Sequence, residues 1–345
     1  MTSPQAGPAA VLCGLGAVLP PRAVPNAELC AELDTNDDWI RTRTGILERR
    51  IAAPGVSTED LAAAAATQAV ESSGISDVDA VVLATTTPDH LMPATAPSVA
   101  ARLGLTGTAA FDVAAVCTGF VYALATAAGL IATRMARTVL VVGADRMSRL
   151  PDPGDRTTRP LFADGAGAVV LRAGDTAEPG VLGPMVLGSD GTHRDLLVVP
   201  HGGHMQMQGP DLFRHAVDRM SAVTRQAVQL AGWCLTDVDR VVPHQANSRI
   251  TAAVGRHLEI AADRRVQNIE YVGNTGAASI PLALAQASAD GTLRPGHRVC
   301  LTAFGAGLTW GATTLTWPDL KPGRTARPRD VPGAVFDAER VDKVM

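Results

Sequence analysis

The sequence predicts an α/β protein built from two similar halves, residues 1–175 and 176–320, followed by a flexible tail over residues 321–345. Short apolar runs rich in β-branched residues alternate with alanine-rich stretches, a pattern typical of sheets covered by helices on both faces. The two halves also share a rhythm, since TVLVVGADR in the first and RVCLTAFGAG in the second are comparable segments at comparable places. The boundary between them is therefore expected near residue 175.

Continuous apolar runs predict the strands. They are Ala80–Thr87, Ala109–Ala114, Thr138–Val142, Ala168–Leu171, Arg240–Pro243, Arg298–Phe304 and Ala312–Trp317. Strands that are apolar along their whole length are typical of a sheet buried on both faces, not of one with a face in water.

Alanine-rich stretches with capping residues predict helices over Leu61–Ser73, Leu212–Ala231 and Ile280–Asp290. Ser57 or Thr58 is suited to cap the first of these at its start, and Gly74 to end it. Asp211 is the expected cap of the second helix, and Gly291 ends the third. Two polar inserts rich in glycine and proline, residues 151–160 and 201–210, are too long for simple turns and are candidate functional loops.

Composition excludes several classes of protein. Of the 345 residues, 46% are hydrophobic and 19% charged, which is enough apolar content for a large core and excludes a disordered chain. The net charge of -4 argues against a broad basic face for nucleic acid. No run of apolar residues is long enough to span a membrane, and the N-terminus lacks the pattern of a secretory signal.

The cysteines argue against a disulfide framework or a zinc ribbon, because five of them are scattered without a C-x-x-C pair. A reduced cytoplasm is the expected location. His201 and His204 lie in a glycine-rich loop without a third ligand, so we expect solvated side chains there and no metal site.

Cys117 is the first residue with candidate chemistry. In FDVAAVCTGFVYAL a strand ends near Val113 and a helix begins near Cys117 or Thr118. The positive end of a helix dipole and free backbone N–H groups favour a thiolate, which is the nucleophilic form. A buried free cysteine is equally common as a small core residue, so this segment alone leaves both interpretations open.

His244 and Asn274 occupy similar junctions. In VVPHQAN a strand ends at a proline and a helix is expected to begin at His244, while Asn274 lies in the turn of YVGNTGAAS. Ends of strands are where sites form in α/β proteins. Taken alone, His244 is more often a cap or a core residue, and Asn274 a turn residue. The glycine-rich segment AFGAGLTWG offers backbone N–H groups to an oxyanion, or simply forms a tight hairpin.

Taken together and in order, these segments resemble the β-ketoacyl-acyl-carrier-protein synthase III family of the thiolase-like superfamily. The matching blocks are DDWIRTRTGILERR, DVAAVCTGF, LFADGAGAVV, VPHQANSRI, GNTGAASIP and FGAGLTWG, over about residues 10–317. The resemblance implies a thiolase-like αβαβα layered fold of two pseudo-duplicated halves, in a homodimer.

The resemblance also implies an activity and three catalytic residues. Cys117 falls on the nucleophile, which takes an acyl group from acyl-coenzyme A as a thioester. His244 and Asn274 fall on residues that stabilise the enolate formed when malonyl-acyl carrier protein loses carbon dioxide. The oxyanion is held by backbone N–H groups of Cys117, Gly305, Ala306 and Gly307. The product is a 3-oxoacyl thioester, for fatty-acid initiation or a specialised polyketide-type pathway, and no tightly bound cofactor is implied.

Further matches concern the two carriers. Trp39 and Arg156 align with the pair that sandwiches the adenine of coenzyme A, and Arg43 with a residue near its phosphates. Arg249 aligns with a basic residue that docks the acidic carrier protein. Arg214 and Arg256 are additional candidates for docking, although such arginines are also common as solvated surface charges.

Two departures bear on the substrate. Met92 aligns with a bulky aromatic residue that reaches from the partner subunit to close the acyl pocket, and a flexible methionine there predicts a pocket that tolerates acyl groups larger than acetyl. Pro210 replaces an asparagine beside the coenzyme A channel, which removes one polar contact.

Alternatives remain within the same superfamily. A thiolase would carry a second catalytic cysteine at Phe304-Gly305-Ala306, where this sequence has none. An acyltransferase that passes the acyl group from Cys117 to a hydroxyl, amine or other acceptor without condensation shares the first step, so the three residues leave that activity open. The acyl chain, the acceptor and the carrier protein are not fixed by the sequence.

Overall fold

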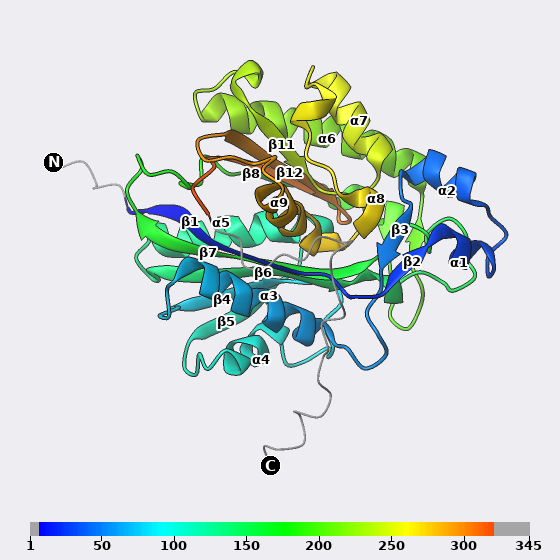
Figure 1. Ribbon diagram of the computed structural model, residues 1–345, viewed down its shortest axis with the longest axis horizontal. Coiled ribbons are helices and arrows are strands. Elements are labelled where there is room, and N and C mark those ends of the chain that lie inside the picture. Colours follow the sequence, from blue (N-terminus) through cyan, green and yellow to red (C-terminus); the bar gives the residue numbers. More distant parts are fainter. Residues whose placement is uncertain (1–6, 321–345) are drawn as a thin grey trace, which may run out of the picture.

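Two β-sheets with helices between and outside them form a five-layer αβαβα architecture, described over residues 7–320 in a computed structural model (Figure 1). In spatial order the first sheet comprises β1 (Ala9–Val18), β7 (Asp164–Gly174), β6 (Thr138–Arg146), β4 (Ala80–Ala84) and β5 (Ala109–Val113). The second comprises β11 (Arg240–Pro243), β12 (Arg298–Gly305), β13 (Thr309–Thr316) and β8 (Val186–Ser189). Two small pairs complete the strands, β2 (Ala23–Pro25) with β3 (Glu48–Arg50) and β9 (Leu197–Val198) with β10 (Gln206–Met207).

The two sheets repeat one topology. In the first, β4 is parallel to β6, and β6 and β1 are both antiparallel to β7. In the second, β11 is parallel to β12, and β12 and β8 are both antiparallel to β13. Within the described residues β5 has no counterpart in the second sheet. The predicted duplication is confirmed; the boundary near residue 175 falls just after β7 and stays a prediction, and the predicted tail at 321–345 lies outside the described residues.

The helices fill three layers. Between the sheets lie α5 (Gly119–Ala132) and α9 (Ser279–Ala289), both rich in alanine; half of the residues of α5 and most of those of α9 are buried (Figure 1). Outside the first sheet lie α3 (Thr58–Ser73) and α4 (Thr95–Arg102). Outside the second lie α6 (Gly209–Leu230) and α7 (Ser248–His257). The shorter helices are α1 (Asn26–Cys30), α2 (Asp37–Thr44) and α8 (Ile269–Val272). None of the described helices is long and apolar enough to cross a membrane.

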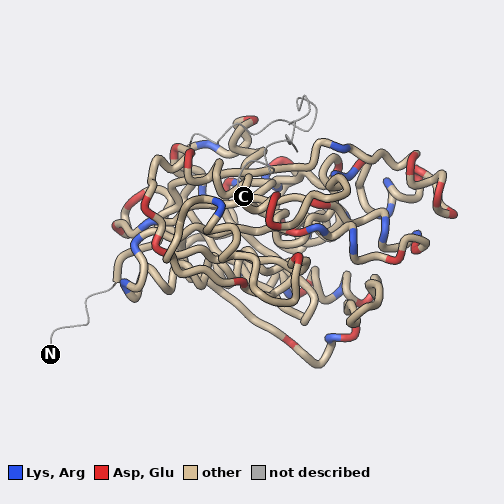
Figure 2. The backbone as a smooth tube through the Cα atoms, turned by 90° about the horizontal axis from the view of Figure 1, so that it is seen from below, with Lys and Arg blue, Asp and Glu red and all other residues tan. Residues whose placement is uncertain are grey.

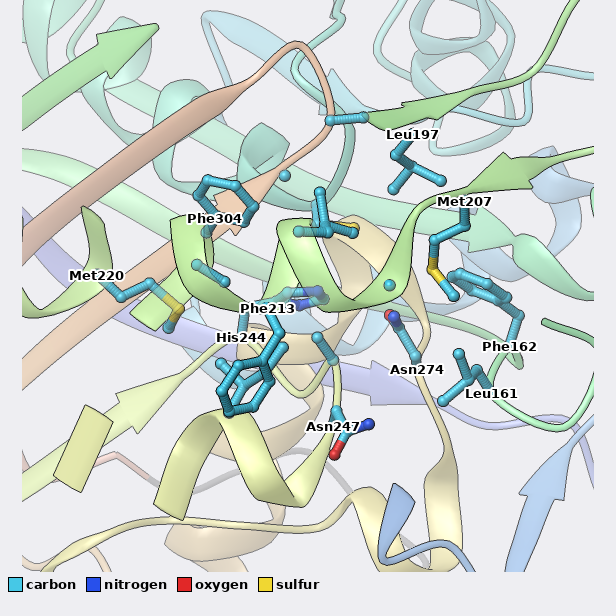
Figure 3. Close-up of a pocket in the computed structure, with 18 residues that line it drawn as sticks. Leu161, Phe162, Leu197, Met207, Phe213, Met220, His244, Asn247, Asn274 and Phe304 are labelled. Carbon is cyan, nitrogen blue, oxygen red and sulfur yellow. The ribbon is translucent and has the colours of Figure 1, made fainter. Parts of the chain in front are cut away.

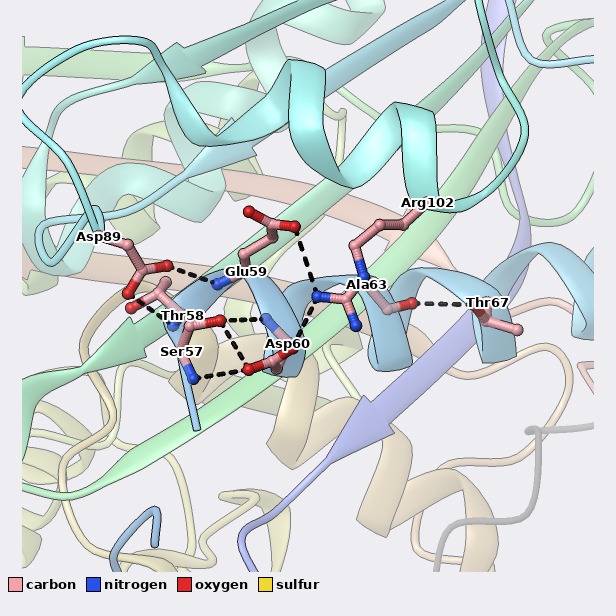
Figure 4. Close-up of polar contacts among 8 residues, drawn as sticks. All are labelled: Ser57, Thr58, Glu59, Asp60, Ala63, Thr67, Asp89 and Arg102. Carbon is pink, nitrogen blue, oxygen red and sulfur yellow. Dashed lines mark hydrogen bonds and ion pairs between the residues drawn. The ribbon is translucent and has the colours of Figure 1, made fainter. Parts of the chain in front are cut away.

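The start of α3 is held by two sets of polar contacts (Figure 4). Ser57 and Asp60 form a capping box, in which the Ser57 hydroxyl accepts from the Asp60 N–H at 2.9 Å and the Asp60 carboxylate accepts from the Ser57 N–H at 2.8 Å. The Asp89 carboxylate accepts the N–H groups of the next two residues, Thr58 at 3.1 Å and Glu59 at 2.9 Å. These contacts satisfy N–H groups that a helix leaves free at its start.

Several expected elements are confirmed and three details are corrected. The caps Ser57 and Gly74 of α3 are as predicted. Asp211 is not a cap, because α6 begins at Gly209 with a proline in its first turn. The helix expected at His244 begins at Ser248, where the Asn247 side chain accepts the Arg249 N–H at 2.9 Å.

The third correction concerns β5, which is an edge strand and not a fully buried one. It pairs with β4 alone among the described strands, and Phe111 on it is 36% exposed.

In the view of Figure 2 basic and acidic residues are interspersed along the chain.

Candidate active site

A single pocket between the two halves brings together Cys117, His244 and Asn274, the three residues predicted to carry the chemistry (Figure 3). It encloses about 720 Å³, counting the solvent at its mouth. In Figure 3, Leu161, Phe162, Leu197 and Met207 gather on one side of Asn274, with His244 and Phe213 on the other. Most of the side chains that line the pocket are apolar, and Cys117, His244, Asn247 and Asn274 are the polar ones.

Cys117 lies where the chain turns from β5 into α5. A short 3-10 turn, Val116–Thr118, leads directly into the helix. Val116 has φ 46°, a left-handed conformation that costs a β-branched residue of order 1–3 kcal/mol. Such strain persists only where the surrounding structure holds the backbone in place, and here it lies directly before Cys117.

The protonation of Cys117 depends on its burial as well as on its place at a helix start. Burial is the main cause that raises the pKa of the thiol to about 12; the nearby Asp145 carboxylate acts in the same direction, and a hydrogen bond from the backbone N–H of Cys117 acts in the opposite one. Position at a helix start was expected to favour the thiolate, but the desolvation of a fully buried sulfur is the larger effect. In the free enzyme the group is a thiol at neutral pH.

His244 follows β11 and is buried at 2% exposure. Its backbone N–H bonds the Thr302 carbonyl at 2.8 Å, and its Nδ1 lies 2.6 Å from the Ser279 hydroxyl. Nε2 is buried and has no hydrogen-bond partner among the described residues. Burial lowers the pKa of the imidazole to about 3, so the ring is neutral throughout the physiological range.

Asn274 is fixed by its backbone and by its side-chain oxygen. Its N–H bonds the Leu161 carbonyl at 2.9 Å, and its own carbonyl accepts the Ala163 N–H at 2.9 Å. Oδ1 accepts the N–H of Gly276 at 3.0 Å, so Nδ2 is the atom left to donate to a ligand. Asp145 braces the same turn by accepting the Ala277 N–H at 2.8 Å.

The glycine-rich segment joins β12 to β13 and packs against the nucleophile. A Cβ on Gly305 would lie 3.0 Å from the Cys117 nitrogen, closer than most Cβ contacts, so a side chain there would require the turn at Cys117 to shift by a few tenths of an ångström. Gly305 and Ala306 line the pocket. Gly307 is not among its lining residues, so of the four residues predicted to bind the oxyanion it has the least support from the structure.

The residues predicted to bind coenzyme A are brought near the site by α2 and the loop after β6. The Arg156 guanidinium carbon lies 5.8 Å from the centre of the Trp39 ring, and its Nη1 donates to the Asp34 carbonyl at 2.8 Å. An adenine would lie between the two planes only after the Arg156 side chain moves aside. Arg43 is exposed on the same helix, and its carbonyl accepts from Asn247 at 2.9 Å.

The three arginines predicted to dock a carrier protein are all exposed on α6 and α7. Arg249 lies over the ring of Phe213, 5.9 Å from its centre, and Phe213 lines the pocket. Across residues 7–320 no ion pair involves Arg249 or Arg256, whereas Arg214 pairs with Asp211. Two of the three cations are thus free of ion pairs among the described residues, and one of them, Arg249, lies beside the pocket.

Met92 lies away from the pocket of its own chain. It is 84% exposed and its neighbour Leu91 is 90% exposed. The base of their loop is anchored, because Asp145 accepts from the Thr86 N–H at 2.6 Å and Asp89 bonds the start of α3. An apolar tip on a fixed base is suited to contact another surface.

The insert at 201–210 contributes to the site in a way the sequence did not reveal. Part of it forms β10, from which Met207 lines the pocket, while His201 and His204 are exposed. Among the described residues no cluster of side chains is suited to a metal. Pro210 lies in the first turn of α6, where the absence of an N–H costs no helical hydrogen bond.

Further pocket residues were missed by the sequence analysis. They come from α6, β9 and β12: Leu212, Ala216, Met220, Leu197 and Phe304. Their signal in the sequence is ordinary helix and strand periodicity, which does not separate a pocket wall from a core.

Family models match two stretches of the chain. Residues 111–191 match the model described as 3-oxoacyl-[acyl-carrier-protein] synthase III, and residues 228–317 match its C-terminal model. The first stretch contains Cys117, and the second contains His244 and Asn274. The predicted resemblance is confirmed.

Comparisons over nearly the whole chain point to the same family as these two models. The chain is 54% identical over 331 residues to beta-ketoacyl-[acyl-carrier-protein] synthase III 3 of Streptomyces coelicolor, covering 91% of this chain and 99% of that protein. It resembles the crystal structure of 3-oxoacyl-(acyl carrier protein) synthase III from Pseudomonas aeruginosa, with TM-score 0.89, 52% identity, and 91% and 100% of the two chains covered. It also resembles the priming beta-ketosynthase of a polyketide biosynthetic pathway, with TM-score 0.87, 34% identity, and 93% and 99% covered. The predicted thiolase-like fold is confirmed.

Proposed function

The chain belongs to the 3-oxoacyl-[acyl-carrier-protein] synthase III family, and on that premise we propose that it is a condensing acyltransferase. It joins an acyl group from acyl-coenzyme A to a malonyl group on acyl carrier protein, with loss of carbon dioxide, and gives a 3-oxoacyl thioester. The reaction starts fatty-acid synthesis or a polyketide-type pathway. The enzyme works in the cytoplasm and needs no tightly bound cofactor.

The proposal rests on the convergence of a buried thiol with two neutral donors in one apolar pocket. Cys117 supplies the nucleophile, and His244 and Asn274 are fixed on their other sides by Ser279 and Gly276. Neutral donors in a desolvated site stabilise an enolate without removing a proton from carbon. This arrangement suits decarboxylation better than acid–base chemistry.

In the first half-reaction the Cys117 sulfur attacks the thioester carbonyl of acyl-coenzyme A. The thiol proton leaves sulfur as the new carbon–sulfur bond forms, and the departing coenzyme A sulfur ends protonated, so charge is balanced. Because burial raises the pKa of Cys117, attack depends on transition-state stabilisation. The N–H groups of Cys117, Gly305 and Ala306 bind the tetrahedral oxyanion.

In the second half-reaction the malonyl carboxylate leaves as carbon dioxide, and its bonding electrons form an enolate on the thioester. His244 and Asn274 hydrogen-bond that oxygen. The enolate carbon attacks the acyl-Cys117 carbonyl, the bond from that carbon to sulfur breaks, and the Cys117 thiolate that leaves takes up a proton from water. A covalent intermediate thus splits one difficult condensation into two steps.

Substrate delivery uses two faces of the pocket mouth. Trp39 and Arg156 hold the adenine of coenzyme A, and Arg43 lies near its phosphates, since guanidinium groups suit both stacking and phosphate binding. Arg249, with Arg214 and Arg256, docks the acidic carrier protein. These roles are supported by the exposure of all five arginines and by the position of Arg249 over Phe213, which lines the pocket.

The working form is a homodimer. The β5 edge, the partly exposed Phe111, and the exposed Leu91 and Met92 offer an apolar surface that a second copy covers. Met92 then closes the acyl pocket of the partner. A thioether in place of an aromatic ring leaves room for acyl groups larger than acetyl.

Carbon dioxide release tests this proposal. Enzyme is loaded from a panel of acyl-coenzyme A donors, the loaded mass is recorded, and malonyl-acyl carrier protein is added. Release that depends on loading supports condensation, and the best donor identifies the acyl class. Loading without release, with several carrier proteins tried, would mean acyl transfer to another acceptor.

A further inference from the structure

Ser279 contacts the imidazole of His244 directly. Its hydroxyl oxygen lies 2.6 Å from Nδ1 and 3.3 Å from the backbone nitrogen of Gln245. Ser279 begins α9 and is 2% exposed, so both contacts are shielded from water. The same short segment that carries Asn274 therefore also carries the residue that holds His244.

The protons of this arrangement can be assigned from the donors and acceptors. The Gln245 N–H can only donate, so it occupies one lone pair of the Ser279 oxygen. The hydroxyl can still donate one hydrogen bond through its own proton. Within residues 7–320 its acceptor is Nδ1 of His244. The opposite assignment, with Nδ1 as donor, leaves the buried hydroxyl proton without an acceptor.

A neutral imidazole carries one N–H. If Nδ1 accepts from Ser279, the proton is on Nε2, the buried atom that has no partner among the described residues. A carboxylate beside Nδ1 would do the reverse, since it would accept the Nδ1 proton and leave Nε2 as a base. The identity of the group beside Nδ1 thus decides what His244 presents to the pocket.

We propose that Ser279 is a positioning residue that fixes His244 in the Nε2–H tautomer and so makes it a hydrogen-bond donor to the enolate. This inference rests on the proposed function and deepens it. Gln245 contributes through its backbone N–H, which orients the hydroxyl. Ser279 itself does not touch the substrate.

The tautomer can be read without any reaction. In enzyme labelled with 15N-histidine, long-range proton–nitrogen spectra separate protonated from unprotonated ring nitrogens. His244→Gln identifies the His244 signals among the eight histidines. We expect the proton on Nε2 of the unliganded wild type. A proton on Nδ1 would overturn the proposal, whatever the activity of the enzyme.

Variants give the second readout. Ser279→Ala should lower malonyl decarboxylation roughly 10- to 100-fold and shift the proton toward Nδ1, with acylation by acyl-coenzyme A unchanged. Ser279→Thr keeps the hydroxyl and should recover most of the rate.

Ser221→Ala is a matched control, because it removes a buried hydroxyl from α6 that has no partner among the described residues. Ser279→Ala with a wild-type rate and tautomer would refute the role. A wild type that never releases carbon dioxide would refute the proposed function instead.

Discussion

Gly305 approaches Cys117 so closely that a methyl group on its Cα would lie 3.0 Å from the Cys117 backbone nitrogen and 3.1 Å from that of Thr118. Both nitrogens belong to the turn that begins α5. The end of β12 in one half is thus fitted against the nucleophile of the other half, and the two together form the proposed oxyanion site.

Gly305→Ala should therefore slow acylation of Cys117 by about 10- to 100-fold, because the added methyl displaces backbone donors from the oxyanion. The rate is measured by the mass of the intact protein after mixing with acyl-coenzyme A. Gly129→Ala is the matched control, since Gly129 lies in α5 with no atom within 4 Å of the added carbon. Equal rates for the Gly305 variant and the wild type would remove the loop from the oxyanion site.

Asn274→Asp should separate the two half-reactions. The carboxylate can still accept the Gly276 N–H, but it replaces the donor Nδ2 with an acceptor that repels an enolate. We expect acylation within about threefold of wild type and decarboxylation lowered by about 100-fold or more. Acylation is the internal control for folding, and a variant that condensed normally would refute the assigned role.

The pH dependence of Cys117 alkylation tests the state of the thiol. Burial raises its pKa to about 12, so the thiolate fraction is small at neutral pH and grows as the pH rises. Modification by iodoacetamide should accelerate about tenfold per pH unit from pH 7 to pH 9, without a plateau. Peptide masses follow Cys117 separately from the exposed Cys234. A plateau below pH 8 would show the stabilised thiolate that the helix start alone predicts.

Arg156→Ala should raise the KM for acyl-coenzyme A by about tenfold, because it removes one of the two residues proposed to hold the adenine, Trp39 being the other. With a short thioester that lacks the nucleotide, the variant should match the wild type. Arg41→Ala is the control, since Arg41 is an exposed cation on α2 paired with Asp37. Equal losses on both substrates would point to a structural fault instead of a lost nucleotide contact.

Arg249→Glu should weaken the use of malonyl-acyl carrier protein by about tenfold or more in kcat/KM and reduce its salt dependence, because a cation at the pocket mouth becomes an anion. Loading from acyl-coenzyme A should hardly change. Arg134→Glu reverses an exposed charge at the end of α5 and serves as control. Equal behaviour of the two variants would place carrier docking elsewhere.

Local patterns predicted the elements that carry the chemistry. Cys117 and His244 each follow an apolar strand that ends where a polar or helical segment begins. This pattern can be read from neighbouring residues alone, without knowledge of tertiary contacts. By contrast β1 was not predicted, because glycines interrupt its apolar run. Side chains at Gly14 and Gly16 would collide with carbonyl oxygens of α3, a contact between segments far apart in the sequence.

The walls of the pocket and the protonation states depend on tertiary packing. Phe304 and Met220 resemble core residues in sequence, and only the approach of β12 to α6 makes them lining residues. The sequence shows the helix start, which favours the thiolate of Cys117, but not the burial of the sulfur, which raises its pKa and is the larger effect. Ser279 lies in the block GNTGAASIP, but the sequence does not show its distance to His244, from which its proposed role is inferred.

The most direct test follows a labelled acyl group through one turnover. Enzyme loaded with a 13C-acyl group on Cys117 is freed of excess donor and mixed with malonyl-acyl carrier protein. We predict labelled 3-oxoacyl-carrier protein and one carbon dioxide for each acyl group lost from Cys117, and neither product from Cys117→Ala. Labelled acyl-carrier protein without carbon dioxide would contradict the account.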